Sequence, residues 1–261
     1  FRTDGYVIAG DALTLAGPFA DITVDDGVSA TIAAELAGAT QLVKKGDGAL
    51  VLDGMNSYTG GTSIEGGVLA VSDDANLGDA AGAVTLVGGT LRILGDMTTG
   101  RDIMIAANSA IEVGEGVNFT YSGRLGGAGR IEKADGGRLD LAGDNAAFSG
   151  TARVSGGLLA VNGSFGGTVE VGPGGRLGGT GRIGKVVNGG TVAPGNSIGT
   201  LTIAGDYVGN GGAIEIEAVL GGDHSPADLL VVEGNTSGSS FVRVINLGGA
   251  GAATQEGIRI I

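Results

Sequence analysis

Residues 44–71 read KKGDGALVLDGMNSYTGGTSIEGGVLAV, and residues 133–161 read KADGGRLDLAGDNAAFSGTARVSGGLLAV. The two stretches share a lysine, a Leu-x-Leu step, an asparagine, an aromatic residue and a closing Gly-Gly-x-Leu-Ala-Val. Their offset is 89 residues between Leu50 and Leu139, with one residue inserted further along. A unit of this length cannot bury its own apolar face. Stacking of such units into a solenoid is therefore predicted.

The rest of the chain keeps the same rhythm of short alternating apolar runs, each followed by Gly, Asn or Asp. Examples are residues 84–86, 91–93, 103–105, 111–113, 169–171 and 201–203. This spacing of short strands and dense turns is typical of an all-β protein. The best helix candidate is the run from Ser29 to Leu36, but it is short and flanked by strand-like segments.

Composition favours a parallel β-helix over the main alternative, a β-sandwich. Glycine contributes 56 of 261 residues and can turn tight corners with positive φ. Aromatic residues make up only 4% while hydrophobic residues make up 42%, so the core must be aliphatic. A sandwich needs longer strands and more aromatic residues. From about residue 205 the strands lengthen, at 213–217, 228–233 and 241–246, and we expect them to form an antiparallel β cap over the open end.

Charge and cysteine content exclude several kinds of function. The formal net charge is −13 and no basic stripe is present, so nucleic acid is not an expected partner. The absence of cysteine removes thiol catalysis, thiolate metal sites and disulfides. No run of 18 apolar residues appears. Both ends of the chain resemble cuts within a longer protein, since no signal peptide precedes Phe1 and residues 258–261 read as part of a strand.

Motifs that elsewhere carry chemistry have simpler explanations here. Residues 195–199 match G-x-S-x-G, but Pro194 precedes them, a strand follows, and the only histidine, His224, lies in a turn. Residues 179–185 resemble a phosphate-binding loop without the following helix. Pairs such as Asp25-Asp26 are expected to be solvated turn carboxylates rather than Ca²⁺ ligands. We therefore expect no catalytic, metal or cofactor-binding residues and no cofactor.

Several segments resemble a known family. Residues 189–203 (GGTVAPGNSIGTLTI) closely resemble the segment that precedes the autochaperone region of bacterial autotransporter (type V secretion) passenger domains, and residues 227–234 and 257–261 resemble the strands that follow it. Residues 44–71 are similar to the passenger-associated β-strand repeat. Ala49 is a departure, because the family often has threonine there.

The resemblance implies a right-handed, single-stranded parallel β-helix that is carried outward by its own C-terminal outer-membrane β-barrel translocator. It implies secretion through the outer membrane to the bacterial cell surface. In this family the C-terminal portion folds first and templates the other coils. The expected division is a stalk over residues 1–149 and a C-terminal unit over residues 150–261, with the cap proper from about residue 205.

The resulting functional hypothesis is a non-enzymatic structural and adhesin-type passenger, with a host-cell surface, a matrix or another copy as the possible partner. One alternative is an enzyme on the same scaffold, such as a polysaccharide hydrolase or a serine esterase. Another is a plain spacer.

Four residues are candidates for surface or folding contacts. Tyr58 and Phe148 occupy matching repeat positions, where they either contact a receptor or cover a coil corner. Asn196 and Tyr207 are the other two candidates.

Overall fold

The computed structural model describes residues 1–261 and confirms the parallel β-helix. Apart from one short 3₁₀ helix, η1 (Asp74–Leu77), every regular element is a strand. The chain forms two compact units, Phe1–Leu139 and Asp140–Ile261, and the division falls within β18 (Arg138–Leu141). The boundary that we expected at 149/150 concerns folding units and stays a prediction. The helix candidate after Ser29 is strand instead, because its alternating residues face the core and solvent in turn.

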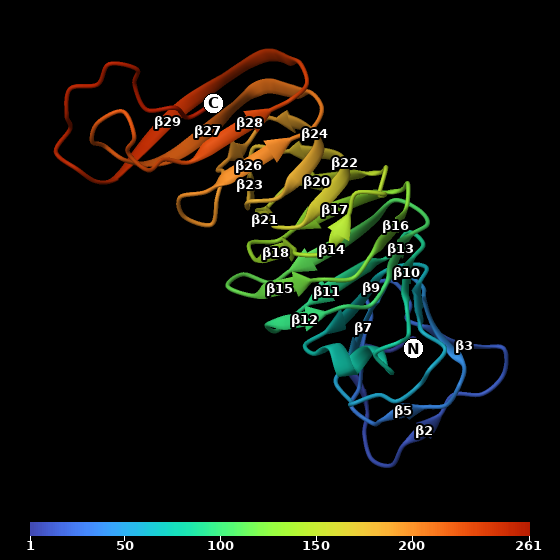
Figure 1. Cartoon of the computed structure of the whole chain (residues 1–261). Helices are drawn as coiled ribbons and strands as arrows, with labels where there is room; N and C mark the ends of the chain where they lie inside the picture. The colour runs from blue at the N-terminus through green and yellow to red at the C-terminus, as the bar shows by residue number, and fades with distance from the viewer. The chain divides into compact units, whose positions relative to one another are not determined.

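In residues 1–139 the strands form parallel stacks (Figure 1). The first stack consists of β1 (Tyr6–Ile8), β4 (Ser29–Ile32), β7 (Ala49–Leu52), β9 (Val68–Val71), β11 (Thr90–Ile93), β14 (Ser109–Val113) and β17 (Arg130–Ala134). The second consists of β3 (Phe19–Thr23), β6 (Gln41–Lys45), β8 (Thr62–Ile64), β10 (Val84–Leu86), β13 (Ile103–Ile105) and β16 (Leu125–Gly127). Shorter pairs are β2 (Leu13–Thr14) with β5 (Leu36–Ala37) and β12 (Met97–Thr99) with β15 (Asn118–Tyr121).

The core of this unit is built from ladders of aliphatic side chains. Strand register places one inward residue directly over the next, as in the series Ile32, Leu52, Val71, Ile93 and Val113. All five side chains are buried. Burial of each such side chain contributes about 1.5–3 kcal/mol, so the repeat itself supplies the core that no single coil could form.

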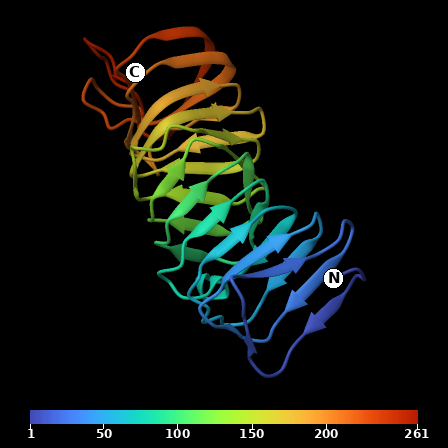
Figure 2. The ribbon, with the colours of Figure 1, turned by 90° about the vertical axis from the view of Figure 1, so that its right-hand side faces the viewer.

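In residues 140–261 the coils are also parallel, and four of the strands are 7–13 residues long. The strands are β19 (Asp144–Asn145), β20 (Thr151–Val154), β21 (Gly157–Val161), β22 (Ser164–Val171), β23 (Gly175–Gly178), β24 (Arg182–Asn188), β25 (Thr191–Val192), β26 (Thr200–Ile203), β27 (Tyr207–Val219), β28 (Leu229–Val232) and β29 (Thr236–Gly248). Figure 2 shows these strands in yellow to red. The step between paired residues grows from 17 (Ala152 to Val169) to 28 (Ile214 to Val242).

The last coils contain strands at all three predicted places, two of them long (β27 and β29) and one of four residues (β28), but their pairing corrects part of the expected cap. β27 pairs with β29, and β26 with β28, in parallel register. Antiparallel pairing is limited to a hairpin arm in which Val219 N–H donates to Pro226 O and Asp228 N–H donates to Glu217 O. The chain keeps winding in the same sense after β27, so each new strand meets the previous coil in parallel.

Candidate functional site

The C-terminal coils contain a buried carboxylate, Asp228, which lies at the end of the arm between β27 and β28. Its Oδ1 accepts a hydrogen bond from Gly199 N–H at 2.9 Å, and its Oδ2 accepts one from Glu217 N–H at 2.8 Å. Burial raises the pKa of this carboxyl, while the two amide donors oppose the shift. One carboxylate therefore clamps the loop after Pro194 to β27.

A second polar cluster joins three successive coils. Asn188, at the end of β24, is fully buried. Its Nδ2 donates to Tyr207 Oη at 3.0 Å and to Ala213 O at 2.9 Å, and its Oδ1 accepts from Gly190 N–H at 3.1 Å. Tyr207 Oη in turn shares a 2.6 Å hydrogen bond with Ser240 Oγ on β29. The cluster fixes the register of β24, β27 and β29 from inside the core.

Outside the core, charged side chains connect the same coils. Glu215 on β27 pairs with Arg176 on β23 and with Arg243 on β29, and the Arg243 contact is 3.2 Å long. Arg182 pairs with Glu233. The exposed Arg182–Glu233 pair is expected to add little stability, because water screens it. The buried amide and carboxylate contacts therefore dominate the specificity of the cap.

The end of the chain folds back onto the last coil. The Asp223 carboxylate accepts hydrogen bonds from the backbone N–H groups of residues 255–257 at 2.9–3.0 Å, and the first of these donors, Gln255, lowers the pKa of this carboxyl. Leu230 N–H donates to Ile260 O at 3.0 Å. A hollow of about 320 Å³ remains, lined mainly by apolar side chains that include Ile214, Leu230 and Ile261.

The structure places the four residues singled out by sequence in separate local settings. Tyr58 is fully buried, its Oη is 2.7 Å from Thr62 Oγ1, and burial raises its pKa to about 12. Phe148 is buried with its ring centroid 5.2 Å from that of Phe165. Asn196 is exposed and donates to Asn162 Oδ1 at 2.8 Å. Of the four, only Tyr207 belongs to the polar cluster just described.

Sequence reasoning missed the buried charged residues. Lys44 and Lys133 occupy the same repeat position, and both point inward. Lys44 Nζ donates to the carbonyls of Lys45, Gly46 and Gly66 at 2.8–3.1 Å, and Lys133 Nζ donates to the next two carbonyls in the same way. The available signal was a lysine at an inward position of an alternating run, present in both repeats.

The serine of the G-x-S-x-G match and the only histidine of the chain do not form a hydrogen-bonded pair. Ser197 lies in an exposed turn and makes no hydrogen bond with His224. No group of three or more His, Cys, Asp or Glu side chains is placed to hold a metal ion. The structure contains no helix with the length and hydrophobicity that a membrane-spanning helix requires.

Comparison with known proteins identifies the family. The pattern of the autochaperone domain type 1 matches residues 184–261, and that of the passenger-associated-transport-repeat matches residues 42–71 and 131–161. An adhesin autotransporter, BmaC of Brucella suis biovar 1, is 44% identical over the whole chain, although the match spans only 8% of that protein. The autotransporter adhesin AIDA-I of Escherichia coli is 48% identical over 24% of this chain and 5% of its own length. An extracellular serine protease of Serratia marcescens is 36% identical over 34% of this chain and 9% of its own length.

Stacked repeat coils followed by an autochaperone region define a secreted β-helical passenger. The chain belongs to the autotransporters and is a segment of their passenger domain. Its place is the bacterial cell surface, which it reaches through the outer membrane.

Proposed function

We propose that this segment is a non-enzymatic, adhesin-type part of a surface-displayed passenger, and that its C-terminal coils start the folding of the whole β-helix. The autochaperone match over residues 184–261 carries the folding part of the proposal, because the buried Asp228 and Asn188 contacts lie within it. The autotransporter relatives support a translocator as the partner during secretion.

The physical basis for the folding order is that the polar contacts of the last coils close within those coils. A coil that forms alone exposes unpaired backbone groups on both edges. In the last coils, Asp228 and Asn188 satisfy backbone groups from chain segments up to 29 residues apart, and these contacts need no further coil. A closed terminal coil then offers a strand edge to the coil before it.

Pulse-labelled hydrogen exchange during refolding of the full chain tests this order. We expect amides of residues 184–261 to gain protection before those of residues 1–139. Asp228→Asn replaces one acceptor oxygen by a donor and should delay protection in both units by about tenfold. Glu233→Gln, which alters only an exposed ion pair, is the matched control and should leave the rates unchanged. Earlier protection of residues 1–139 would refute the proposal.

The adhesive part rests on the names of the relatives BmaC and AIDA-I and needs its own test. Beads coated with the full chain should bind cultured host cells or matrix proteins, or each other, more strongly than beads coated with an equally acidic, unrelated β-helix. Binding equal to that of the control would contradict the adhesive role and favour the spacer hypothesis.

The enzyme alternative is retained because one relative is named a serine protease. Peptide, ester and glycan substrates would be incubated with the wild type, with Ser197→Ala and with His224→Ala. We expect no turnover above buffer in any of the three. Turnover that both substitutions abolish would favour the enzyme.

A further inference from the structure

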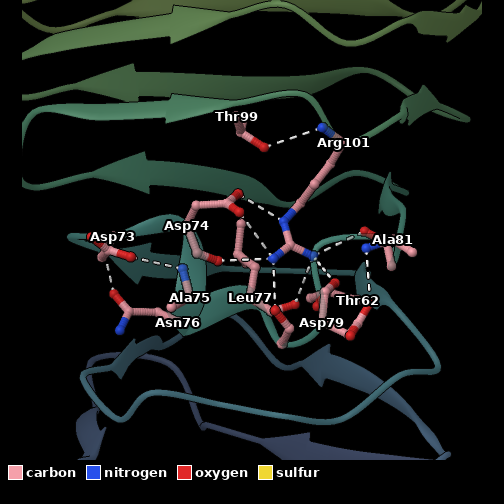
Figure 3. A network of polar contacts seen from close by, with 12 residues as sticks. Thr62, Asp73, Asp74, Ala75, Asn76, Leu77, Asp79, Ala81, Thr99 and Arg101 are labelled. Carbon is pink, nitrogen blue, oxygen red and sulfur yellow. Dashed lines mark hydrogen bonds and ion pairs between the residues drawn. The ribbon is translucent and has the colours of Figure 1, made fainter.

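Arg101 is a buried cation with an extensive hydrogen-bond network of its own (Figure 3). Its side chain is only 1% exposed. Nε donates to Asp74 Oδ1 at 2.7 Å, and Nη2 donates to Asp74 Oδ2 at 3.2 Å and to Asp74 O at 3.0 Å. The guanidinium also donates to Gly78 O at 2.7 Å, to Gly82 O at 3.1 Å and to Asp79 O. Almost all of its donor capacity is therefore directed at one short segment.

That segment, residues 72–83, lies between β9 and β10 and contains no strand. On its other two sides the same coil pairs through β9 and β10 with the strands of its neighbours. Residues 72–83 offer no strand edge. Arg101, which belongs to the following coil, supplies the missing donors from a planar fork with fixed geometry.

The same segment also binds the coil on its other side. Asn56 N–H donates to Ala75 O at 2.9 Å, Asn76 Nδ2 donates to Gly54 O at 3.0 Å, and Asp79 N–H donates to Tyr58 O at 2.9 Å. Asn56 Oδ1 then accepts a 2.8 Å hydrogen bond from Leu36 N–H in the coil before that. The contacts form a series that runs from Arg101 through residues 74–82 and residues 54–58 to Leu36.

We propose that Arg101 is a positioning residue for coil propagation: it shapes residues 74–82 into the surface on which residues 54–58 dock. The proposal rests on the proposed C-terminal-to-N-terminal folding order. In that order the coil of Arg101 is complete before residues 74–82 settle, so the guanidinium acts as their template. Arg101 thereby replaces the missing strand edge on this one side of the coil, where β9 and β10 give no pairing.

The test is pulse-labelled hydrogen exchange on the refolding full chain, comparing the wild type with Arg101→Met. The methionine keeps part of the apolar stem and removes every donor. We expect amides of residues 103–139 to become protected at the wild-type rate and those of residues 28–71 about tenfold more slowly. Arg101→Lys, which retains a charge but not the fork, should give an intermediate delay. Arg92→Met, which breaks the half-exposed pair with Glu112 between neighbouring coils, should leave both rates unchanged.

Two results overturn the proposal. A purely structural role would leave both protection rates of Arg101→Met at the wild-type value and accelerate only unfolding. Slower or absent protection of residues 103–139 in Arg101→Met would show that the substitution does not act specifically on the coils that precede Arg101. Refutation of the folding order is a separate result, because it is seen in the wild type. There, residues 28–71 would become protected before or together with residues 103–139.

Discussion

Single buried polar residues decide which coil lies on which. Lys44, Arg101, Lys133, Asn188 and Asp228 all satisfy backbone groups rather than other charged side chains for most of their contacts. A buried polar group without its partner costs about 1–3 kcal/mol, so a register shift by one coil is strongly disfavoured. The aliphatic ladders cannot make this distinction, since one valine or leucine rung resembles another.

The two inward lysines predict a rise of stability with pH. Burial lowers the pKa of Lys44 and of Lys133 to about 8, against 10.5 for the exposed group. Between these values the unfolded chain binds a proton that the folded chain does not, so the free energy of unfolding increases as the pH rises from 8 to 10.5. We expect a gain on the order of 2 kcal/mol per lysine from pH 7.5 to 10, measured by urea unfolding.

The variants Lys44→Met and Lys133→Met should lose this rise. Lys45→Met is the control, because Lys45 is exposed and its hydrogen bond with Asp21 raises its pKa. Its removal should leave the rise intact. Equal pH profiles for wild type and Lys44→Met would contradict the assignment.

Asn188 provides a second test at the residue scale. Asn188→Ala leaves Gly190 N–H, Ala213 O and Tyr207 Oη without their partner in the core. We expect the free energy of unfolding to fall by about 2–4 kcal/mol. Asn235→Ala, which removes an exposed contact with Asp206, should cost less than about 1 kcal/mol. Similar losses for the two variants would show that the cluster is not the register device of the cap.

At the scale of the element, corners limit the sequence more tightly than strands do. Gly67 precedes β9 with φ +58°, and a Cβ there would lie 2.3 Å from Gly48 O of the neighbouring coil. Gly116 has a similar φ of +76° but open space around it. The cost of positive φ can therefore be measured separately from the cost of a clash with the neighbouring coil.

Gly67→Ala should consequently be more damaging than Gly116→Ala. Strain alone should cost about 1–2 kcal/mol at Gly116, whereas the contact with neighbouring backbone should raise the loss at Gly67 to about 3 kcal/mol or more. Thermal unfolding followed by circular dichroism measures both. Equal losses would show that the coils can separate locally without cost.

At the scale of the whole molecule, the two units should differ in autonomy. The C-terminal unit holds its polar clamps within residues 182–240, whereas the N-terminal unit depends on templated coils in our proposal. Residues 150–261 alone should resist protease and show β-rich circular dichroism, and residues 1–149 alone should be labile. The opposite result would contradict the division of labour between the units.

Much of this architecture could be predicted from the sequence. The repeated 44–71 unit indicated a solenoid, and the alternating triplets predicted strands such as Val84–Leu86 and Ile103–Ile105 where they occur. The lengthening of strands after residue 205 also appeared in β27 and β29, whereas β28 has only four residues. The direction of pairing in the cap did not follow, because long alternating strands look alike in parallel and antiparallel sheets.

The sequence by itself determined the period, the aliphatic core and the glycine corners, since each depends on residues close together in the chain. Only the tertiary structure decided the roles of Arg101, Lys44, Asn188 and Asp228. Many of their partners are carbonyl and amide groups about 20 or more residues away. Every residue but proline carries both of these groups, so residue type does not show which of them coil stacking brings into hydrogen-bond distance.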